Sequence, residues 1–123
     1  MTRSRPILVI DDNPETRGAL LRVLAFKGYP VIGFPDAAAA LDFLSDQDAS
    51  LVILDLAMPI MSGMDFLDVR DRDPDLARIP VIVYSAYRKD GFRNVCGYAA
   101  KHDDPDRLLE LIERCRLRTH LPT

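Results

Sequence analysis

Leu51-Val52-Ile53-Leu54-Asp55-Leu56-Ala57-Met58-Pro59 decides the fold, because four large apolar residues run without a break into one carboxylate. An apolar run of this length, bounded by turn residues, is typical of a strand that is buried on both faces of a sheet. Asp55 then lies where the strand leaves the sheet, and it needs a partner because an unpaired buried charge is costly. By itself the stretch also fits a turn or helix-capping aspartate, so the rest of the chain must decide.

Composition restricts the class of protein. The chain has 123 residues, of which 48% are hydrophobic, so we expect residues 1–123 to form a single domain with its core at about 6–117. A net charge of −3 argues against nucleic acid as a partner, and no apolar run is long enough for a membrane span or signal peptide. Cys96 and Cys115 lack the spacing of a metal site, and we interpret them as reduced thiols of a cytoplasmic protein.

Strand and helix patterns alternate along the chain. Ile7–Ile10 is a second continuous apolar run, and Asn13-Pro14 then starts a helix that Gly28 ends. The same criteria predict strands at 29–34, 79–84 and 96–100, helices at about 36–44, at 64–72 and from 104–105 onward, and at most one or two helical turns within 87–95. This alternation predicts an α/β fold with a parallel sheet, right-handed crossovers and helices on both faces.

Helical spacing predicts which side chains face the core. The predicted inward set is Leu20, Leu21 and Leu24, with Val23 as a further candidate, then Ala37, Ala40, Leu41 and Leu44, then Phe66, Leu67 and Arg70, and last Leu108, Leu109, Leu111, Ile112 and Cys115. Arg114, Arg116 and Arg118 suit the carboxyl end of the last helix, where positive charge is favoured. A basic docking patch is the alternative interpretation of these arginines.

Polar residues follow the predicted strands. Asp11-Asp12 follows the first strand and Asp55 the third, while Ser85 and Lys101 follow the fourth and fifth. The carboxyl ends of parallel strands share one edge of the sheet, where ligands and chemistry collect. Three neighbouring carboxylates repel one another unless a cation offsets them, and Mg²⁺ suits a site of a few carboxylates. With an ammonium group beside it, one carboxylate could act as a nucleophile toward phosphorus.

At these positions the sequence resembles the receiver domain of two-component response regulators. The matching motifs are Ile10-Asp11-Asp12, Asp55–Pro59 with Gly63, Tyr84-Ser85-Ala86, and Tyr98 three residues before Lys101. The resemblance covers about residues 6–117. It implies a flavodoxin-like doubly wound sheet with strand order 2-1-3-4-5, and a fourth helix that is shortened because the segment from Ser85 to Lys101 is short for the family.

The resemblance also implies a function. The domain would be a phosphorylation-activated switch rather than an enzyme, phosphorylated by a histidine kinase or a histidine phosphotransfer protein, and its output would pass through contact with a protein target. The implied roles are phosphoacceptor for Asp55, Mg²⁺ ligands for Asp11, Asp12, Asp55 and the main-chain carbonyl of Ala57, phosphoryl contact for Lys101, and switch residues for Ser85 and Tyr98.

Two further departures from the family pattern concern the end of the chain. His102 stands where the family usually has a proline with a cis bond, so we expect a trans bond or a remodelled loop that could change the reach of Lys101. The usual glycine-alanine pair before the fifth strand is missing from 94–97.

Three alternatives stay open from the sequence. One is a degenerate receiver that binds partners without phosphorylation. A second is a phosphatase of the haloacid dehalogenase class, whose second aspartate is missing here because Asn13 stands two residues after Asp11. A third is a flavodoxin-like cofactor module, whose phosphate loop the acids of 11–14 would oppose. A weak homodimer through the last helix is compatible with the sequence but has no support in it.

Overall fold

The computed structural model describes residues 5–56, 58, 61–86 and 94–120. Its centre is a five-stranded parallel sheet with the strand order β2-β1-β3-β4-β5. The strands are β1 (Ile7–Ile10), β2 (Val31–Phe34), β3 (Leu51–Leu54), β4 (Val81–Ser85) and β5 (Gly97–Ala100). The predicted fold class and strand order are therefore confirmed.

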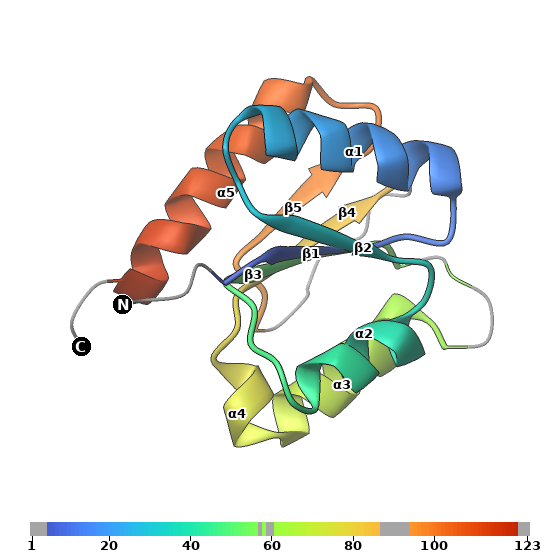
Figure 1. The fold of residues 1–123 in the computed structure, drawn as a ribbon, viewed down its shortest axis with the longest axis vertical. Helices are drawn as coiled ribbons and strands as arrows, with labels where there is room; N and C mark the ends of the chain where they lie inside the picture. Colours follow the sequence, from blue (N-terminus) through green and yellow to red (C-terminus); the bar gives the residue numbers. More distant parts are fainter. Residues whose placement is uncertain (1–4, 57, 59–60, 87–93, 121–123) are drawn as a thin grey trace.

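Helices lie on both faces of the sheet. α1 (Pro14–Phe26) and α5 (Pro105–His120) cover one face, and α2 (Ala37–Leu44) and α3 (Gly63–Arg72) cover the other, with the short α4 (Pro74–Ala77) beside them (Figure 1). This arrangement encloses two apolar layers, one on each side of the sheet. Every residue of β1 and β3 is buried, as expected for central strands of a parallel sheet.

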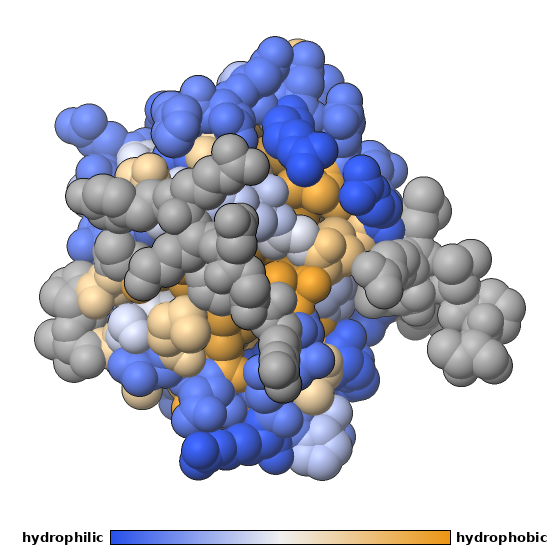
Figure 2. Space-filling view, turned by 180° about the vertical axis from the view of Figure 1, so that it is seen from behind, coloured by the Kyte–Doolittle hydropathy of each residue, from blue (hydrophilic) through white to orange (hydrophobic). Residues whose placement is uncertain are grey.

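The surface is polar where helices face solvent. Seen from behind, hydrophilic side chains lie above and below a middle zone where hydrophobic side chains come to the surface (Figure 2). Within the described part of the chain, no helix is both long and apolar enough to cross a membrane.

The predicted capping residues stand at the helix ends. Asn13 accepts hydrogen bonds from the backbone N–H groups of Glu15 and Thr16 at the start of α1, and Asp36 accepts one from Ala39 at the start of α2. After α1, Gly28 has a φ of 94°, a left-handed conformation that favours glycine. These local signals are short-range, which explains why the sequence predicts the helix starts well.

Several details differ from the predictions. Val23 is 41% exposed, so the apolar stripe of α1 is narrower than proposed. The second strand begins at Val31 instead of residue 29, since the N–H of Tyr29 still bonds to the carbonyl of Leu24 at the end of α1. Pro74 ends α3 as predicted but also begins α4, which the sequence did not indicate. The predicted shortened helix between β4 and β5 falls mostly on 87–93, outside the described residues.

The interpretation of the cysteines as two free thiols is wrong. Cys96, one residue before β5, and Cys115 on α5 form a disulfide, with their Cα atoms 5.9 Å apart. The pairing arises because α5 packs closely on β5: a Cβ atom added to Gly97 would lie 2.8 Å from a side-chain carbon of Leu111. Contact between a strand end and a helix 19 residues later is a tertiary feature that cysteine spacing does not reveal.

Candidate functional site

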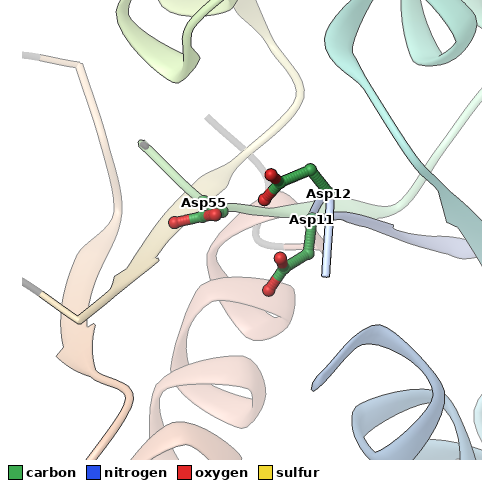
Figure 3. A group of neighbouring side chains, drawn as sticks. All are labelled: Asp11, Asp12 and Asp55. Carbon is green, nitrogen blue, oxygen red and sulfur yellow. The ribbon is translucent and has the colours of Figure 1, made fainter. Parts of the chain in front are cut away.

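Three carboxylates meet at the carboxyl edge of the sheet. Asp11 and Asp12 follow β1, and Asp55 follows the neighbouring β3, whose residue Leu54 is in register with Ile10. The side chains leave these two strand ends close together (Figure 3), and one oxygen from each lies within 4.8 Å of the others. Asp11 and Asp55 are 2% and 5% exposed, whereas Asp12 is exposed.

Hydrogen bonds hold Asp11 and Asp55 in place at the ends of their strands. Asp11 Oδ1 accepts a hydrogen bond of 2.9 Å from the backbone N–H of Asn13. The main-chain carbonyl of Asp11 accepts a bond of 2.7 Å from the guanidinium of Arg17, one turn into α1. The backbone N–H of Asp55 donates to the carbonyl of Ile10 at 2.9 Å, which aligns the two strand ends. Both buried acids are thus placed by the sheet and by the start of α1.

Lys101 brings the opposing charge. Its Nζ lies 2.8 Å from Asp11 Oδ2 and 3.5 Å from Asp55 Oδ2. Burial by itself lowers the pKa of Lys101, but the carboxylates of Asp11 and Asp55 outweigh that effect, so its pKa is raised above the ordinary value. The side chain therefore stays an ammonium ion, since the charged form is the one that the two acids stabilise.

The loop that follows Lys101 does not prevent this contact. All peptide bonds among the described residues are trans, including the one that precedes His102. The backbone N–H of Lys101 donates to the carbonyl of Ser85 at 2.9 Å, extending the pairing of β4 and β5. The backbone N–H of Ala100 donates to Asp103, which ties the loop to the end of β5. Lys101 thus reaches the two buried acids without the family's proline.

Gly63 lies against the main chain that carries Asp55. A Cβ atom added there would lie 2.4 Å from the main-chain oxygen of Asp55 and 2.8 Å from the Cα of Leu56. Its backbone N–H donates to the carbonyl of Leu56 at 3.1 Å. Only glycine allows the start of α3 to approach the end of β3 this closely. Ser62 caps the same helix by a capping box with Asp65.

Ser85, Tyr98 and Ala57 are the remaining residues that the sequence predicted for the site. Ser85 ends β4 and is 1% exposed, at the edge where the acids lie. Tyr98 lies within β5 and is partly buried, and its role as a switch stays a prediction. Ala57, proposed as a metal ligand through its carbonyl, lies outside the described residues.

The sequence did not single out Arg17 as part of the site. Its position in the first turn of α1 is one that many exposed residues occupy, so the pattern gave no signal. Tyr84 was identified only as part of a motif. Burial raises the pKa of its phenol, and the positive charge of Lys101 opposes that shift while Asp11 and Asp103 add to it. Arg17 thus contacts the main chain of Asp11, and Tyr84 lies within the electrostatic influence of Lys101 and Asp11.

The donor set fits a small divalent cation. Asp11, Asp12 and Asp55 each offer one carboxylate oxygen within 4.8 Å of the others, and Mg²⁺ is a hard cation that prefers oxygen ligands of this kind. Three carboxylates face one ammonium group, so negative charge is in excess and a cation is electrostatically favoured. The residues present therefore suit a metal with hard oxygen ligands.

Comparisons with known proteins agree with this geometry. The uncharacterized 14.6 kDa protein in the sodA1 3′ region of Leptolyngbya boryana is 32% identical over 114 residues, covering 88% of this chain and 87% of that protein. Response regulator MprA of Mycobacterium sp. (strain KMS) is 36% identical over 115 residues, 89% of this chain and 48% of that protein. The chain thus spans about half the length of that regulator.

The fold comparison points the same way. The crystal structure of response regulator protein TrrA from Thermotoga maritima in complex with Mg²⁺-BeF has a TM-score of 0.79 at 26% identity, covering 90% of this chain and 98% of that one. A family model described as the response regulator receiver domain matches residues 7–113. The strand order, the acidic edge and these matches lead to one conclusion: the chain belongs to the response regulator receiver domain family.

Proposed function

We propose that this domain is a phosphorylation-activated switch of a two-component phosphorelay, with Asp55 as the phosphoryl acceptor. A carboxylate oxygen of Asp55 would attack the phosphorus of a phosphohistidine donor while the phosphorus–nitrogen bond breaks and the imidazole leaves. The donor would be a histidine kinase or a histidine phosphotransfer protein. The observation that carries the proposal is the contact of Lys101 with both Asp11 and Asp55 at the strand ends.

The charges around Asp55 suit this step. Phosphoryl transfer depends mainly on in-line positioning and on neutralising the charge of the transferred group. Asp11, Asp12 and Asp55, with the carbonyl of Ala57, would hold Mg²⁺, which when bound would neutralise phosphoryl oxygens. Lys101 would move from its two carboxylates toward the phosphoryl group, and the buried Ser85 hydroxyl would donate to it. These two shifts are the local change that a switch requires.

Support for the metal comes from the acidic cluster and from a relative. The TrrA structure with Mg²⁺-BeF belongs to a protein that is 26% identical to this chain, and its fold matches across nine-tenths of it. The three carboxylates here offer oxygen ligands of the kind that Mg²⁺ prefers. Catalysis beyond phosphorylation and dephosphorylation of its own aspartate is not part of the proposal.

The output is proposed to pass through protein contact. A downstream protein would bind the phosphorylated form, and neither nucleic acid nor membrane is required. A cytoplasmic location stays a prediction and no longer rests on free thiols, because the cysteines are paired. A weak homodimer through α5 also stays a prediction. The basic patch has less support, since Arg116 stacks on Tyr29 at 4.7 Å and pairs with Glu113.

The test is phosphorylation by a small donor. Wild-type protein is incubated with acetyl phosphate and Mg²⁺ and analysed by intact mass, beside Asp55→Asn and the control Asp68→Asn, an exposed residue of α3. We expect one added phosphoryl group on wild type and on Asp68→Asn, and none on Asp55→Asn. Absence of phosphate on folded wild type would favour the alternative, a degenerate receiver that binds partners without phosphorylation.

A further inference from the structure

A pocket of about 420 Å³ lies at the amino edge of the sheet, far along the strands from the acidic site. Pro80, which precedes β4, and Cys96, which precedes β5, line it from the sheet. Arg70 and Asp71 line it from α3, and Cys115 lines it from α5. Both halves of the disulfide therefore border a cavity that is open to solvent.

The two cysteines of the disulfide differ in their exposure to solvent. Cys115 is fully buried, within the apolar layer between the sheet and the α1 and α5 helices. Cys96 is partly exposed and packs at the margin of that layer. A reagent that enters the pocket would therefore meet Cys96 first, and Cys115 would be the sulfur that leaves.

A buried positive charge forms part of the pocket wall. The Arg70 side chain is 6% exposed, and its guanidinium donates to the carbonyl of Ile79 at 2.7 Å, to the carbonyl of Asn94, and to Asp71. Its Nε–H is buried and has no hydrogen-bond partner among the described residues. The positive charge of the guanidinium in the pocket wall favours an approaching anion such as a thiolate. The carboxylate of Asp71, 32% exposed, opposes that anion.

We propose that Cys96–Cys115 is a redox-active disulfide, reduced through this pocket by an external dithiol. A thiolate of the dithiol attacks the sulfur of Cys96, the bond between the two cysteine sulfurs breaks, and Cys115 leaves as a thiolate that takes a proton in its apolar surroundings. The second thiol of the reductant, as a thiolate, then attacks the reductant's sulfur in the mixed disulfide. Cys96 leaves as a thiolate and takes up a proton. Two electrons pass to the protein, which gains two thiols, and the reductant becomes a disulfide.

Reduction would remove the covalent tether between Cys96 and α5 and leave the sheet in place. The backbone N–H of Cys96 donates to the carbonyl of Val81 at 2.8 Å, and β5 pairs with β4 from Gly97 onward. The close packing of Gly97 on Leu111 also persists without the bridge. Without the bridge, the segment 94–96 is held by backbone hydrogen bonds such as that of Cys96 and by the bond from Arg70 to Asn94, and it leads into the β5 strand that ends just before Lys101. This inference rests on these contacts and is independent of phosphoryl transfer.

The test follows the rate of reduction in the folded chain. Full-length protein is treated with dithiothreitol in native buffer and in rising sub-denaturing urea, quenched, alkylated with iodoacetamide and weighed to count free thiols. We expect two alkylated cysteines at a rate that is flat across this urea range. A rate that rises with the slope of global unfolding would overturn the proposal, because it would mean that the bond is reached only in the unfolded chain.

Two variants and one further measurement sharpen the result. With glutathione as the anionic thiol, Asp71→Asn should speed reduction about two- to threefold, because it removes the negative charge at the pocket, while the matched Asp68→Asn should not. Equal rates in the two variants would rule out the pocket as the route. Hydrogen exchange of the reduced protein should quicken at 94–97 only, and loss of protection in β1 and β3 as well would show a purely structural bridge.

Discussion

The two edges of the sheet hold buried charge in opposite ways. At the carboxyl edge, Asp11 and Asp55 share a single ammonium group and leave negative charge in excess. At the amino edge, the guanidinium of Arg70 is bound by two main-chain carbonyls and by Asp71. Buried charge is therefore incompletely compensated at the carboxyl edge and almost fully compensated at the amino edge.

This difference distinguishes a candidate reactive site, at the carboxyl edge, from a structural group of charges, at the amino edge. A buried charge whose partners are fixed backbone groups holds elements together, and removing it leaves those groups unsatisfied. Carboxylates that share one side-chain ammonium group can exchange it for a metal or a phosphoryl group at lower cost than backbone groups that lose their partner. The same sheet therefore carries a rigid end, which joins α3, β4 and the approach to β5, and a reactive end.

The largest expected effect is at the rigid end. Arg70→Met would leave the carbonyls of Ile79 and Asn94 without their donor, so we expect the free energy of unfolding to fall by about 3–5 kcal/mol. Urea denaturation measures this change. Arg72→Met on the same helix, whose side chain is 79% exposed, should stay within about 0.5 kcal/mol of wild type. Similar losses in both variants would contradict the assigned role of Arg70.

A substitution at Gly63 tests whether the reactive end needs the close approach of α3 to the main chain of Asp55. Gly63→Ala forces a Cβ atom against the main chain of Asp55, so the end of β3 or the start of α3 must move. We expect a loss of about 1–3 kcal/mol in stability together with slower phosphorylation by acetyl phosphate. Gly18→Ala is the control, because a Cβ there meets no atom closer than 3.6 Å. Unchanged phosphorylation in a destabilised Gly63→Ala would show that this contact serves the fold alone.

The excess negative charge predicts opposite effects on stability and on metal binding. Asp12→Asn removes repulsion within the cluster, so the metal-free protein should gain up to about 1 kcal/mol. Loss of one carboxylate ligand should weaken Mg²⁺ binding at least about tenfold. Thermal unfolding with and without Mg²⁺ measures both effects. A variant that loses stability without Mg²⁺ would show that the carboxylates are not in mutual repulsion.

The smallest expected effect concerns Asp48, which bridges Arg5 and Arg78 at the rigid end. Burial raises the pKa of this carboxyl, but the N–H of Ala49 and the two arginines outweigh burial and lower it below 3.8. Its contribution is therefore present above pH 4 and is lost as the pH falls through the folded-state pKa. Because the group is partly exposed, Asp48→Asn should cost less than about 1 kcal/mol at pH 7.

Acid denaturation checks that sign. The stability difference between wild type and Asp48→Asn should shrink as the pH falls below about 4. Asp46→Asn, which removes a neighbouring exposed acid, is the matched control for the change of charge. A difference that grows on acidification would mean that the arginines do not stabilise the charged form.

The fold could be predicted because its signals are local and strong. The apolar runs of β1 and β3, with acids directly after them, indicate buried parallel strands and place Asp11 and Asp55 at one edge. The helical spacing of Arg70 with Phe66 and Leu67 predicted that Arg70 is buried. It could not predict the carbonyl partners of Arg70, which lie 9 and 24 residues away in the sequence. The disulfide was missed for the same reason, since the approach of β5 to α5 depends on packing at Gly97.

The most direct measurement locates the phosphoryl group. After reaction with acetyl phosphate and Mg²⁺, the acyl phosphate is trapped by borohydride reduction, and the modified residue is identified by peptide mass spectrometry. We expect modification at Asp55 alone, and none when Mg²⁺ is chelated. Modification at Asp11 or Asp12 in place of Asp55, or a reaction that does not depend on the metal, would contradict this expectation.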